Sequence, residues 1–449
     1  MRVHFIAIGG SVMHQLAISL KKKGYEVTGS DDEIFEPARS NLHEEGLLPA
    51  VFGWDNNKIV PGIDAVILGM HARQDNPELL KAIELGLKIY SFPEYIYNES
   101  REKIRVAIGG SHGKTSTTAM IMHVLQKLNR AFDYMVGARL EGFEQSVNIT
   151  DAPVIICEAD EYPASILEKR PKFHFLFPQV AVLTGIAWDH INVFPTFDFY
   201  LEQFRIFIGM IEKNGLLIYN KTDKVLDDLI EKTLRADIKY APYTLPDFSI
   251  SEGKTEIKLD GDSAVISVFG EHNLLNLNAA YLVCKELGVS ASEFLNSIKD
   301  FKGAAKRLEL LSSNDNFNVY RDFAHAPSKV TASINAVKQQ FPSRKLIAVL
   351  ELHTYSSLNE SFLHQYEGAM EPADEAAVFY SSHALELKRM PSLPPETVVD
   401  NFKKKGLKVF NEREQLENWL KEHTFSNANL LLMSSGSFDN MDVTNVIQQ

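Results

Sequence analysis

Residues 104–120 combine the residue types that bind a phosphate group. A short apolar strand enters a glycine turn and leaves as a helix that opens on a lysine and two hydroxyl residues. The turn and first helical residues are Gly110, Ser111, His112, Gly113, Lys114, Thr115 and Ser116. Backbone N–H groups and the positive helix end face the anion, the lysine adds a charge, and a threonine hydroxyl can reach a magnesium ion. The glycine spacing is two residues shorter than in the common G-x-x-x-x-G-K-[ST] loop, so a generic nucleoside triphosphatase is not the natural match. The alternative is a Gly-Ser turn before an ordinary helix.

Acidic and histidine residues follow two further strands of the same region. Glu158 and Asp160 end an apolar strand predicted over residues 153–157, and His190 follows one predicted over residues 180–184. Alternate residues of an extended segment share a face, so we expect Glu158 and Asp160 to point the same way and bind magnesium. We expect the two strands to be neighbours, so that the neutral imidazole of His190 completes the metal site or holds a carboxylate. The alternatives are a solvated acidic loop and a capping or core histidine.

The N-terminal strand runs into a second glycine turn. This turn consists of Gly9, Gly10, Ser11, Val12 and Met13, and it resembles a dinucleotide-binding fingerprint that lacks its third glycine. Asp31 follows the next predicted strand, where a carboxylate can bind a ribose hydroxyl. The turn is therefore compatible with NAD or FAD, with another nucleotide, or with an ordinary Rossmann-like turn.

Polar residues also gather on both sides of residue 302. Asn273 and Asn276 open a predicted helix, where an amide can cap the helix or pair with an adenine edge. Arg307 offers a guanidinium for bidentate phosphate contact, and Asp322 and His325 end a predicted strand. Each of these residues alone is more often a cap, a surface pair or a loop residue, so only their occurrence together indicates a binding site.

The composition is that of a soluble globular protein. The chain has 449 residues, a net charge of −13 and a mean hydropathy of −0.14. Without long blocks of like charge, this balance argues against non-specific nucleic-acid or membrane binding. No apolar run reaches the ~18 residues of a membrane span, and the apolar N-terminus precedes its lysines, as in a first strand rather than a signal peptide. Cys157 and Cys284 lie in apolar runs and predict buried thiols in a reducing cytoplasm; the oligomeric state stays open.

Alternating strand and helix signals predict an α/β protein of three domains. Strands are expected over residues 3–8, 25–29, 65–68, 153–157, 180–184, 215–219, 317–321, 345–349, 376–380 and 430–433, with a β-rich patch over 249–269 and a helix over 274–287. The predicted domains are a Rossmann-like domain over residues 1–99, a central P-loop ATPase-type α/β domain over residues 100–302 and a C-terminal Rossmann-like α/β domain over residues 303–449.

Each motif alone leaves alternatives open, but the order of six motifs along the chain is more specific than any one of them. They occupy residues 110–117, 158–161, 188–190, 270–276, 306–309 and 322–327. Together they resemble the Mur ligase family, ATP-dependent enzymes that form amide bonds in peptidoglycan metabolism, over essentially the whole chain. The resemblance implies that the N-terminal domain binds a UDP-sugar rather than NAD. It also implies that the central domain binds ATP with Mg²⁺ and that the C-terminal domain brings the amine substrate.

The resemblance also implies roles for individual residues. Lys114, Glu158 and His190 are expected to be catalytic, and Thr115, Glu158 and His190 to hold the metal. ATP binding is assigned to Gly110, Ser111, His112, Gly113, Lys114, Thr115, Ser116, Asn273, Asn276, Arg307, Asp322 and His325. UDP-sugar binding is assigned to Gly9, Gly10, Ser11, Val12, Met13, Asp31, His71, Arg73 and Asn76.

Within the family, the N-terminal turn resembles the branch that accepts UDP-N-acetylmuramate. That branch holds a ligase of de novo peptidoglycan synthesis that adds L-alanine. It also holds a recycling ligase that attaches the murein tripeptide L-alanyl-γ-D-glutamyl-meso-diaminopimelate. Residues 34–37, 68–78, 351–357 and 433–438 look like the tripeptide ligase, which we favour, with the L-alanine ligase as the alternative.

Two features depart from the family pattern. Relatives that act later in the pathway use a carbamylated lysine as a magnesium ligand, whereas residues 197–209 hold no lysine and Gln203 is the nearest equivalent. The DNPR-like signature by which another relative grips diaminopimelate is absent, so the sequence does not locate the residues that would bind the far end of the tripeptide.

The reaction that the resemblance implies has two steps. The lactyl carboxylate of UDP-N-acetylmuramate attacks the γ-phosphate of ATP, and the alanyl amine then attacks the acyl phosphate. Lys114 and magnesium would neutralise charge on the transferred phosphoryl group, and closure of the third domain would exclude water. A nicotinamide-dependent oxidoreductase is a remote alternative that leaves Lys114, Glu158 and Arg307 without a task. An ATP-regulated binding protein that has lost group transfer is another.

Overall fold

The protein divides into two compact units. The computed structural model describes residues 1–449 except 138–139, 166, 189–192, 304–306, 424–425 and 444–449. The first unit holds Met1–Thr244 and Leu275–Ser297, and the second holds Leu245–Leu274 and Ile298–Gln449. Within the described ranges the strands form four sheets, and no helix there is long and apolar enough to cross a membrane.

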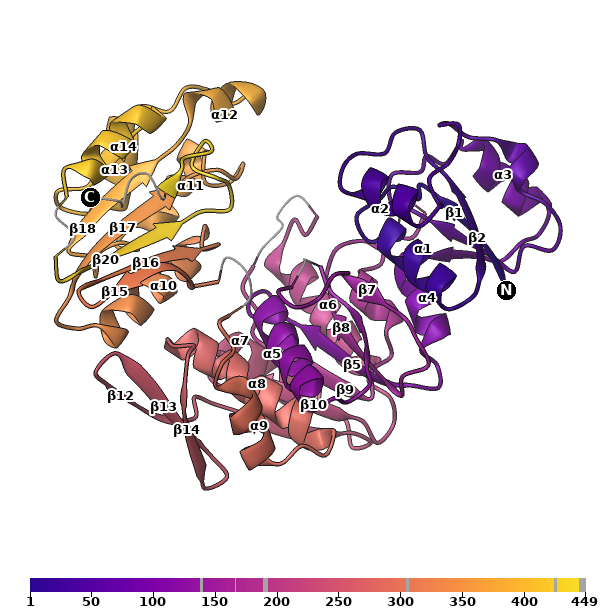
Figure 1. The fold of residues 1–449 in the computed structure, drawn as a ribbon, viewed down its shortest axis with the longest axis horizontal. Helices are drawn as coiled ribbons and strands as arrows, with labels where there is room; N and C mark the ends of the chain where they lie inside the picture. The colour runs from indigo at the N-terminus through magenta and orange to yellow at the C-terminus, as the bar shows by residue number, and fades with distance from the viewer. Residues whose placement is uncertain (138–139, 166, 189–192, 304–306, 424–425, 444–449) are drawn as a thin grey trace. The chain divides into compact units, whose positions relative to one another are not determined.

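The first unit begins with a four-stranded parallel sheet of order β2-β1-β3-β4 (Figure 1). Its strands are β1 (Arg2–Ile6), β2 (Glu26–Ser30), β3 (Ala65–Leu68) and β4 (Ile89–Ser91), and its helices are α1 (Met13–Lys22), α2 (Ala38–Glu44), α3 (Pro77–Glu84), α4 (Phe92–Glu99) and the 3₁₀ turn η1 (Asn56–Lys58). From β1 the chain passes to β2, which pairs with one edge of β1, whereas β3 pairs with the other edge. The first glycine turn therefore lies at a topological switch point, where α/β proteins bind ligands.

A seven-stranded sheet of order β11-β10-β9-β5-β8-β6-β7 follows. Its strands are β5 (Ile104–Gly109), β6 (Asp133–Met135), β7 (Val147–Asn148), β8 (Val154–Glu158), β9 (Val180–Leu183), β10 (Leu216–Asn220) and β11 (Lys239–Tyr243). Around it lie α5 (Lys114–Lys127), η2 (Lys172–Phe175), α6 (Phe197–Gly209), α7 (Lys224–Lys232), α8 (Glu271–Glu286), of which Leu275 onward belongs to this unit, and α9 (Ala291–Ile298). Only β7 among these strands runs antiparallel to its neighbour.

The expectation that β8 and β9 are neighbours is wrong. Strand β5 pairs with both of them and lies between them. After β5 the chain first forms β6, β7 and β8 on one side of it and then β9, β10 and β11 on the other, so β8 and β9 lie on opposite sides of β5. The phosphate turn after β5 consequently lies between the acidic segment after β8 and the Trp188 segment after β9.

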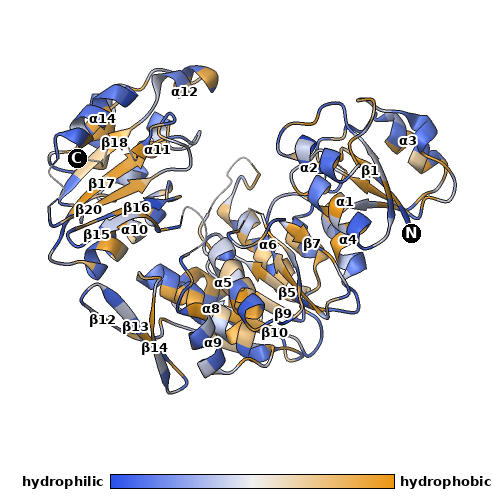
Figure 2. Ribbon diagram, viewed as in Figure 1, coloured by the Kyte–Doolittle hydropathy of each residue, from blue (hydrophilic) through white to orange (hydrophobic). Residues whose placement is uncertain are grey.

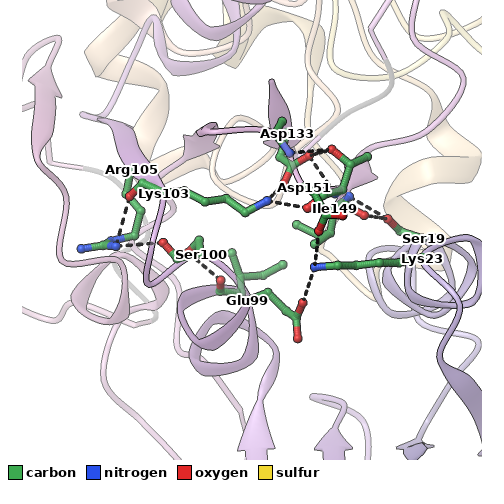
Figure 3. A network of polar contacts seen from close by, with 12 residues as sticks. Ser19, Lys23, Glu99, Ser100, Lys103, Arg105, Asp133, Ile149 and Asp151 are labelled. Carbon is green, nitrogen blue, oxygen red and sulfur yellow. Dashed lines mark hydrogen bonds and ion pairs between the residues drawn. The ribbon is translucent and has the colours of Figure 1, made fainter. Parts of the chain in front are cut away.

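Polar contacts join the two sheets of the first unit (Figure 3). The hydroxyl of Ser19 on α1 accepts a hydrogen bond from the Ile149 amide at 2.7 Å. Beside it, Lys23 pairs with Glu99 at 3.0 Å. Deeper in the same network, Asp133 is fully buried and pairs with the Lys103 ammonium. Removing a charge from such a pair leaves its partner buried and uncompensated.

The second unit contains two sheets. The three-stranded antiparallel sheet is β12 (Asp247–Ser251), β13 (Lys254–Leu259) and β14 (Asp262–Ile266), and the six-stranded sheet has the order β15-β16-β20-β17-β18-β19. The strands of the larger sheet are β15 (Glu309–Asn314), β16 (Phe317–Asp322), β17 (Lys345–Glu351), β18 (Glu375–Phe379), β19 (Lys408–Phe410) and β20 (Ala428–Met433). Its helices are α10 (Pro327–Gln340), α11 (Glu360–Leu363), η3 (His364–Tyr366), α12 (Ser382–Leu387), α13 (Pro395–Phe402) and α14 (Arg413–Lys421).

The central parallel strands, such as β1, β9 and β17, are buried on both faces, as their continuous apolar runs predict. Figure 2 shows hydrophobic colour along central strands such as β1, β9 and β17. Alternate residues of β17 enter two different cores, with Ala348 in the one that includes α10 and α13, and Val349 in the one that includes α14. Cys157 and Cys284 are buried free thiols, as predicted.

The α/β class predicted from the sequence is confirmed, and most predicted strands lie within a residue or two of the observed ones. One grouping differs, because β12–β14 belong to the second unit rather than to the central domain. Gln340 of α10 explains this placement: it donates to the Gly253 carbonyl at 2.6 Å and accepts from the Thr255 hydroxyl at 2.9 Å. The domain boundaries after residues 99 and 302 stay predictions.

We predict that Asp133→Ala lowers the free energy of unfolding of the first unit by about 3 kcal/mol or more, because the Lys103 ammonium loses its buried partner. Urea unfolding followed by circular dichroism measures the change. Glu84→Ala, which removes an exposed partner of Lys81 in the same unit, serves as the control and should change stability little. Equal effects of the two changes would contradict the assignment of Asp133 as a structural anchor.

Candidate functional site

The phosphate turn has a backbone that two glycines make possible. Gly110 has φ +126° and Gly113 has φ +83°, in the left-handed region that favours glycine. A Cβ at Gly110 would strike the Thr184 hydroxyl after β9, and one at Gly113 would strike the amide oxygen of Asn276 on α8. The turn is therefore packed between two elements. Asn276 lies against it, consistent with its predicted place in the ATP site.

Lys114 opens α5 and is held by two acceptors. Its ammonium donates to the Gly110 carbonyl at 2.7 Å and to Glu161 Oε2 at 2.7 Å. Burial alone would lower the pKa of Lys114, but the Glu161 carboxylate holds that pKa above its ordinary value. The lysine therefore carries a positive charge inside the turn, as phosphate binding requires.

Glu161 is a site residue that the sequence analysis did not single out. Its side chain is buried, and it is the ion-pair partner of Lys114. Strand β8 ends at Glu158, so the alternation that was used to select Glu158 and Asp160 does not extend to Asp160. The sequence did contain a signal for Glu161. A lysine with little exposure requires a carboxylate partner, and the acidic segment at residues 158–161 offers one.

Glu158 lies beside Thr115, as predicted. The Thr115 hydroxyl donates to Glu158 Oε1 at 2.8 Å, and the Gly137 amide donates to Oε2 at 3.3 Å. Asp160, which was expected to share this face, is ion-paired: its Oδ2 accepts from Lys172 at 2.7 Å. Burial would raise the pKa of Asp160, but the Lys172 ammonium holds it below its usual range.

The Thr115 hydroxyl and the Glu158 carboxylate fit a magnesium ion, which takes oxygen ligands from one or two side chains and completes its shell with water and phosphate oxygens. His190, the third predicted ligand, lies outside the described residues. Within the part of the chain that the structure describes, no group of three or more His, Cys, Asp or Glu side chains is arranged to hold a metal ion.

Helix α6 sends Tyr200 toward the phosphate turn rather than Gln203. Gln203 turns back on its own helix, where its amide donates to the Phe199 carbonyl at 2.9 Å. The Tyr200 hydroxyl lies 2.8 Å from Ser111 Oγ and 3.4 Å from Glu161 Oε1. The interpretation of Gln203 as the counterpart of a carbamylated lysine is therefore not supported by its position.

The first glycine turn is shaped by Asp31, which is buried. The Gly9 amide donates to Asp31 Oδ2 at 2.7 Å, so this buried carboxylate fixes the backbone of the turn. Burial raises the pKa of Asp31 to about 6, with the neighbouring Asp32 carboxyl acting in the same direction. His14 Nδ1 lies 2.8 Å from the Gly10 carbonyl and holds the other side of the turn.

The remaining predicted UDP-sugar residues surround this turn in different ways. Ser11 is exposed, Val12 is half-buried, and Met13 is buried at the start of α1. His71 and Arg73 are exposed in the segment after β3. Asn76 is buried, and its side-chain oxygen caps α3 by accepting from the Glu78 and Leu79 amides at 2.9 and 3.1 Å. These placements leave their predicted role in UDP-sugar binding as a proposal.

In the second unit, the predicted ATP residues form a separate cluster. Asp322 is buried and accepts from the Leu308 and Ala324 amides, each at 2.7 Å, and burial raises its pKa. The Arg307 guanidinium lies over the Phe323 ring at 4.8 Å. The Asn273 amide donates to the Phe269 carbonyl at 3.0 Å, and His325 Nδ1 lies 2.8 Å from the Phe323 carbonyl.

Two of the segments that favour a tripeptide acceptor meet in the second unit. They follow β17 and β20, which are adjacent parallel strands. Glu351, buried at the end of β17, accepts from the Ser434 hydroxyl and from the Phe438 amide, the latter at 2.8 Å. Gly436 packs directly on His353, where a Cβ would lie 2.8 Å from the imidazole. The two segments are therefore held against each other.

Comparison with known proteins assigns family models to three stretches of the chain. The Mur ligase middle domain matches residues 108–284, the Mur ligase family catalytic domain residues 2–103, and the Mur ligase glutamate ligase domain residues 306–436.

Named relatives and a solved structure agree with these matches. A UDP-N-acetylmuramate–L-alanine ligase from Caldicellulosiruptor bescii is 31% identical over 83% of this chain and 82% of its own length. The UDP-N-acetylmuramate–L-alanyl-γ-D-glutamyl-meso-2,6-diaminoheptandioate ligase of Escherichia coli is 28% identical over 78% of this chain and 79% of its own. The crystal structure of UDP-N-acetylmuramate–alanine ligase from Thermotoga maritima has a TM-score of 0.67, with 22% identity over 98% of this chain and 97% of that chain.

We predict that Asp31→Asn flattens the dependence of stability on pH. A carboxyl whose pKa is raised on folding binds more protons in the folded state, so wild-type stability falls as pH rises from about 4 to about 6. The variant lacks this pH-dependent contribution to stability. The melting temperature of wild type should therefore fall relative to that of the variant as pH rises across this window. Asp75→Asn, at an exposed site, should track wild type. A constant difference between Asp31→Asn and wild type from pH 4.5 to 7 would contradict the raised pKa.

Proposed function

The chain belongs to the Mur ligase family, and on that premise we propose that it joins the lactyl carboxylate of UDP-N-acetylmuramate to an L-alanyl amine. Members of this family are ATP-dependent ligases that form C–N bonds in peptidoglycan synthesis, so the enzyme class and the use of ATP follow from membership. Membership leaves the oxidoreductase alternative without support.

The observation that carries the proposal is the ion-paired, half-buried lysine of the phosphate turn. Lys114 lies 2.7 Å from both the Gly110 carbonyl and Glu161, on a turn whose backbone requires glycine. The positive end of α5 and the lysine charge converge on the space that a phosphate group would fill. Thr115 and Glu158 present oxygen atoms beside it.

The reaction requires activation because a carboxylate and an amine do not condense in water. We assign Lys114 to the neutralisation of charge on the transferred γ-phosphoryl group, which passes from ATP to the lactyl carboxylate. Thr115, Glu158 and His190 would hold a magnesium ion, which when bound supplies further neutralisation of phosphate charge. The amine then attacks the acyl carbon, and inorganic phosphate leaves with the former carboxylate oxygen.

The remaining site residues are assigned by the same proposal. The turn from Gly9 to Met13, with Asp31 beneath it, would bind the UDP group, and His71, Arg73 and Asn76 would contact the sugar nucleotide from the segment after β3. Asn273, Asn276, Arg307, Asp322 and His325 would contact ATP. The support for Asn276 is its contact with Gly113, and the support for the others is their place in the family motifs.

Free L-alanine is the first candidate acceptor. The relative at 31% identity is named for it, whereas the relative named for the tripeptide is 28% identical. The tripeptide favoured by the sequence analysis is the second candidate, and one specific observation supports it. Residues 351–357 and 433–438, which look like the tripeptide ligase, are held together by hydrogen bonds to the buried Glu351 carboxylate. Both acceptors present the same L-alanyl amine.

We predict that Lys114→Ala reduces the rate of ADP formation by about a hundredfold or more, because the phosphoryl group loses an electrostatic contact. A coupled ADP assay with UDP-N-acetylmuramate and each amine measures the rate. Lys172→Ala is the matched control, since Lys172 pairs with Asp160 on the same acidic segment and should keep most of its activity. Near-normal turnover in Lys114→Ala would exclude the phosphate turn as the ATP site.

We also predict that an L-alanyl amine, free or at the head of the tripeptide, releases ADP far faster than D-alanine at equal concentration. A site that pairs its polar groups with one ligand can reject another by up to about 10⁴-fold. The product mass identifies the acceptor. Faster release with free L-alanine supports the first candidate and faster release with the tripeptide the second. No dependence on either amine would contradict the proposed function.

A further inference from the structure

A buried chain of hydrogen bonds connects four elements around Lys114. The Ala187 amide after β9 donates to Ser111 Oγ at 2.9 Å, and Ser111 Oγ lies 2.8 Å from the Tyr200 hydroxyl on α6. The Tyr200 hydroxyl donates to Glu161 Oε1 at 3.4 Å, and Lys114 occupies the other oxygen, Oε2. Tyr200 is 0% exposed and Glu161 is 1% exposed.

The chemistry of the groups gives this chain a direction. A carboxylate only accepts, so the single proton of the Tyr200 hydroxyl is directed to Glu161. Tyr200 therefore accepts from Ser111, whose own oxygen accepts from the Ala187 amide. Every donor in the chain points toward Glu161, so the negative charge is stabilised from two sides.

The ring of Tyr200 is fixed by aromatic packing. Its centroid lies 5.0 Å from that of Phe194 and 5.1 Å from that of Phe204, the latter edge to face. Both contacts persist if only the hydroxyl is removed. The hydroxyl can therefore be tested separately from the packing.

We infer that Tyr200 is a positioning residue that sets how readily Lys114 leaves Glu161 for the phosphate groups of a nucleotide. The inference rests on the proposed function, in which Lys114 contacts ATP. A lysine in such a turn reaches the β-phosphate as well as the γ-phosphate, so ADP also engages it. It adds a role for a residue of α6, the helix that holds no lysine.

The physical reason is the cost of leaving a charge buried. When Lys114 turns toward phosphate, Glu161 loses the positive charge that lies 2.7 Å from its Oε2, and this loss costs free energy because the carboxylate is buried. The hydroxyl of Tyr200, supported by Ser111, stays on Oε1 and offsets part of that cost. Without it, Glu161 keeps Lys114 more tightly, and the nucleotide has to compete for the ammonium.

Tyr200→Phe tests the inference through nucleotide affinity. We expect the dissociation constant of ADP, measured by titration calorimetry, to rise about five- to tenfold, as for the loss of one hydrogen bond to a charged group. The KM for ATP should rise in parallel, while the KM for UDP-N-acetylmuramate stays within about twofold. Tyr25→Phe is a matched control. The Tyr25 hydroxyl donates to Glu99 at 3.1 Å, and Glu99 also pairs with Lys23, so a tyrosine, a glutamate and a lysine are combined there as they are at Tyr200.

A double-mutant cycle separates positioning from general stability. Glu161→Gln removes the charge that Tyr200 serves, so adding Tyr200→Phe to that variant should change ADP affinity by less than about twofold. An undiminished effect in the Glu161→Gln background, or unchanged ADP affinity in Tyr200→Phe, would overturn the inference. Either result leaves the proposed function standing if Lys114→Ala still abolishes turnover. Wild-type protein that binds no ADP would overturn both.

Discussion

The phosphate turn that we propose as the ATP site depends on one largely buried ion pair, between Lys114 and Glu161. The lysine comes from the helix after β5 and the glutamate from the segment after β8, so the pair ties the phosphate turn to the next strand of the sheet. A buried lysine without a carboxylate would lose its charge, and a phosphate turn without that charge would bind its ligand poorly. In the proposed site, Glu161, Tyr200 and Ser111 therefore together stabilise the charges that keep Lys114 in the turn.

Parallel sheets bring these groups together because their strands end at a common edge. In the seven-stranded sheet β5 is central, so segments after β8 and β9 flank the phosphate turn from both sides. The four-stranded sheet repeats the plan with a glycine turn after β1, held by Asp31 and His14. Contacts from α1 to β7 place both turns in one compact unit (Figure 3).

The sequence predicted features that local chemistry decides, and it missed those that depend on packing. The two glycine turns and the strand positions follow from residue type and spacing. Glu161 was missed because β8 ends at Glu158, beyond which alternation no longer orders the side chains. Tyr200 was missed because which residue of α6 faces the site depends on how the helix packs. The order of β8 and β9 is likewise a property of the whole sheet.

The proposed function requires that ATP phosphorylate the lactyl carboxylate before the amide bond forms. Oxygen-isotope transfer tests this claim regardless of the amine used. UDP-N-acetylmuramate labelled with ¹⁸O in its carboxylate is turned over with ATP, magnesium and both candidate amines, and the released inorganic phosphate is analysed by mass spectrometry. A phosphorylated carboxylate leaves one of its oxygens in each phosphate released. Phosphate that carries no label beyond background would contradict the proposed function, because the carboxylate would then never have been bonded to the phosphoryl group.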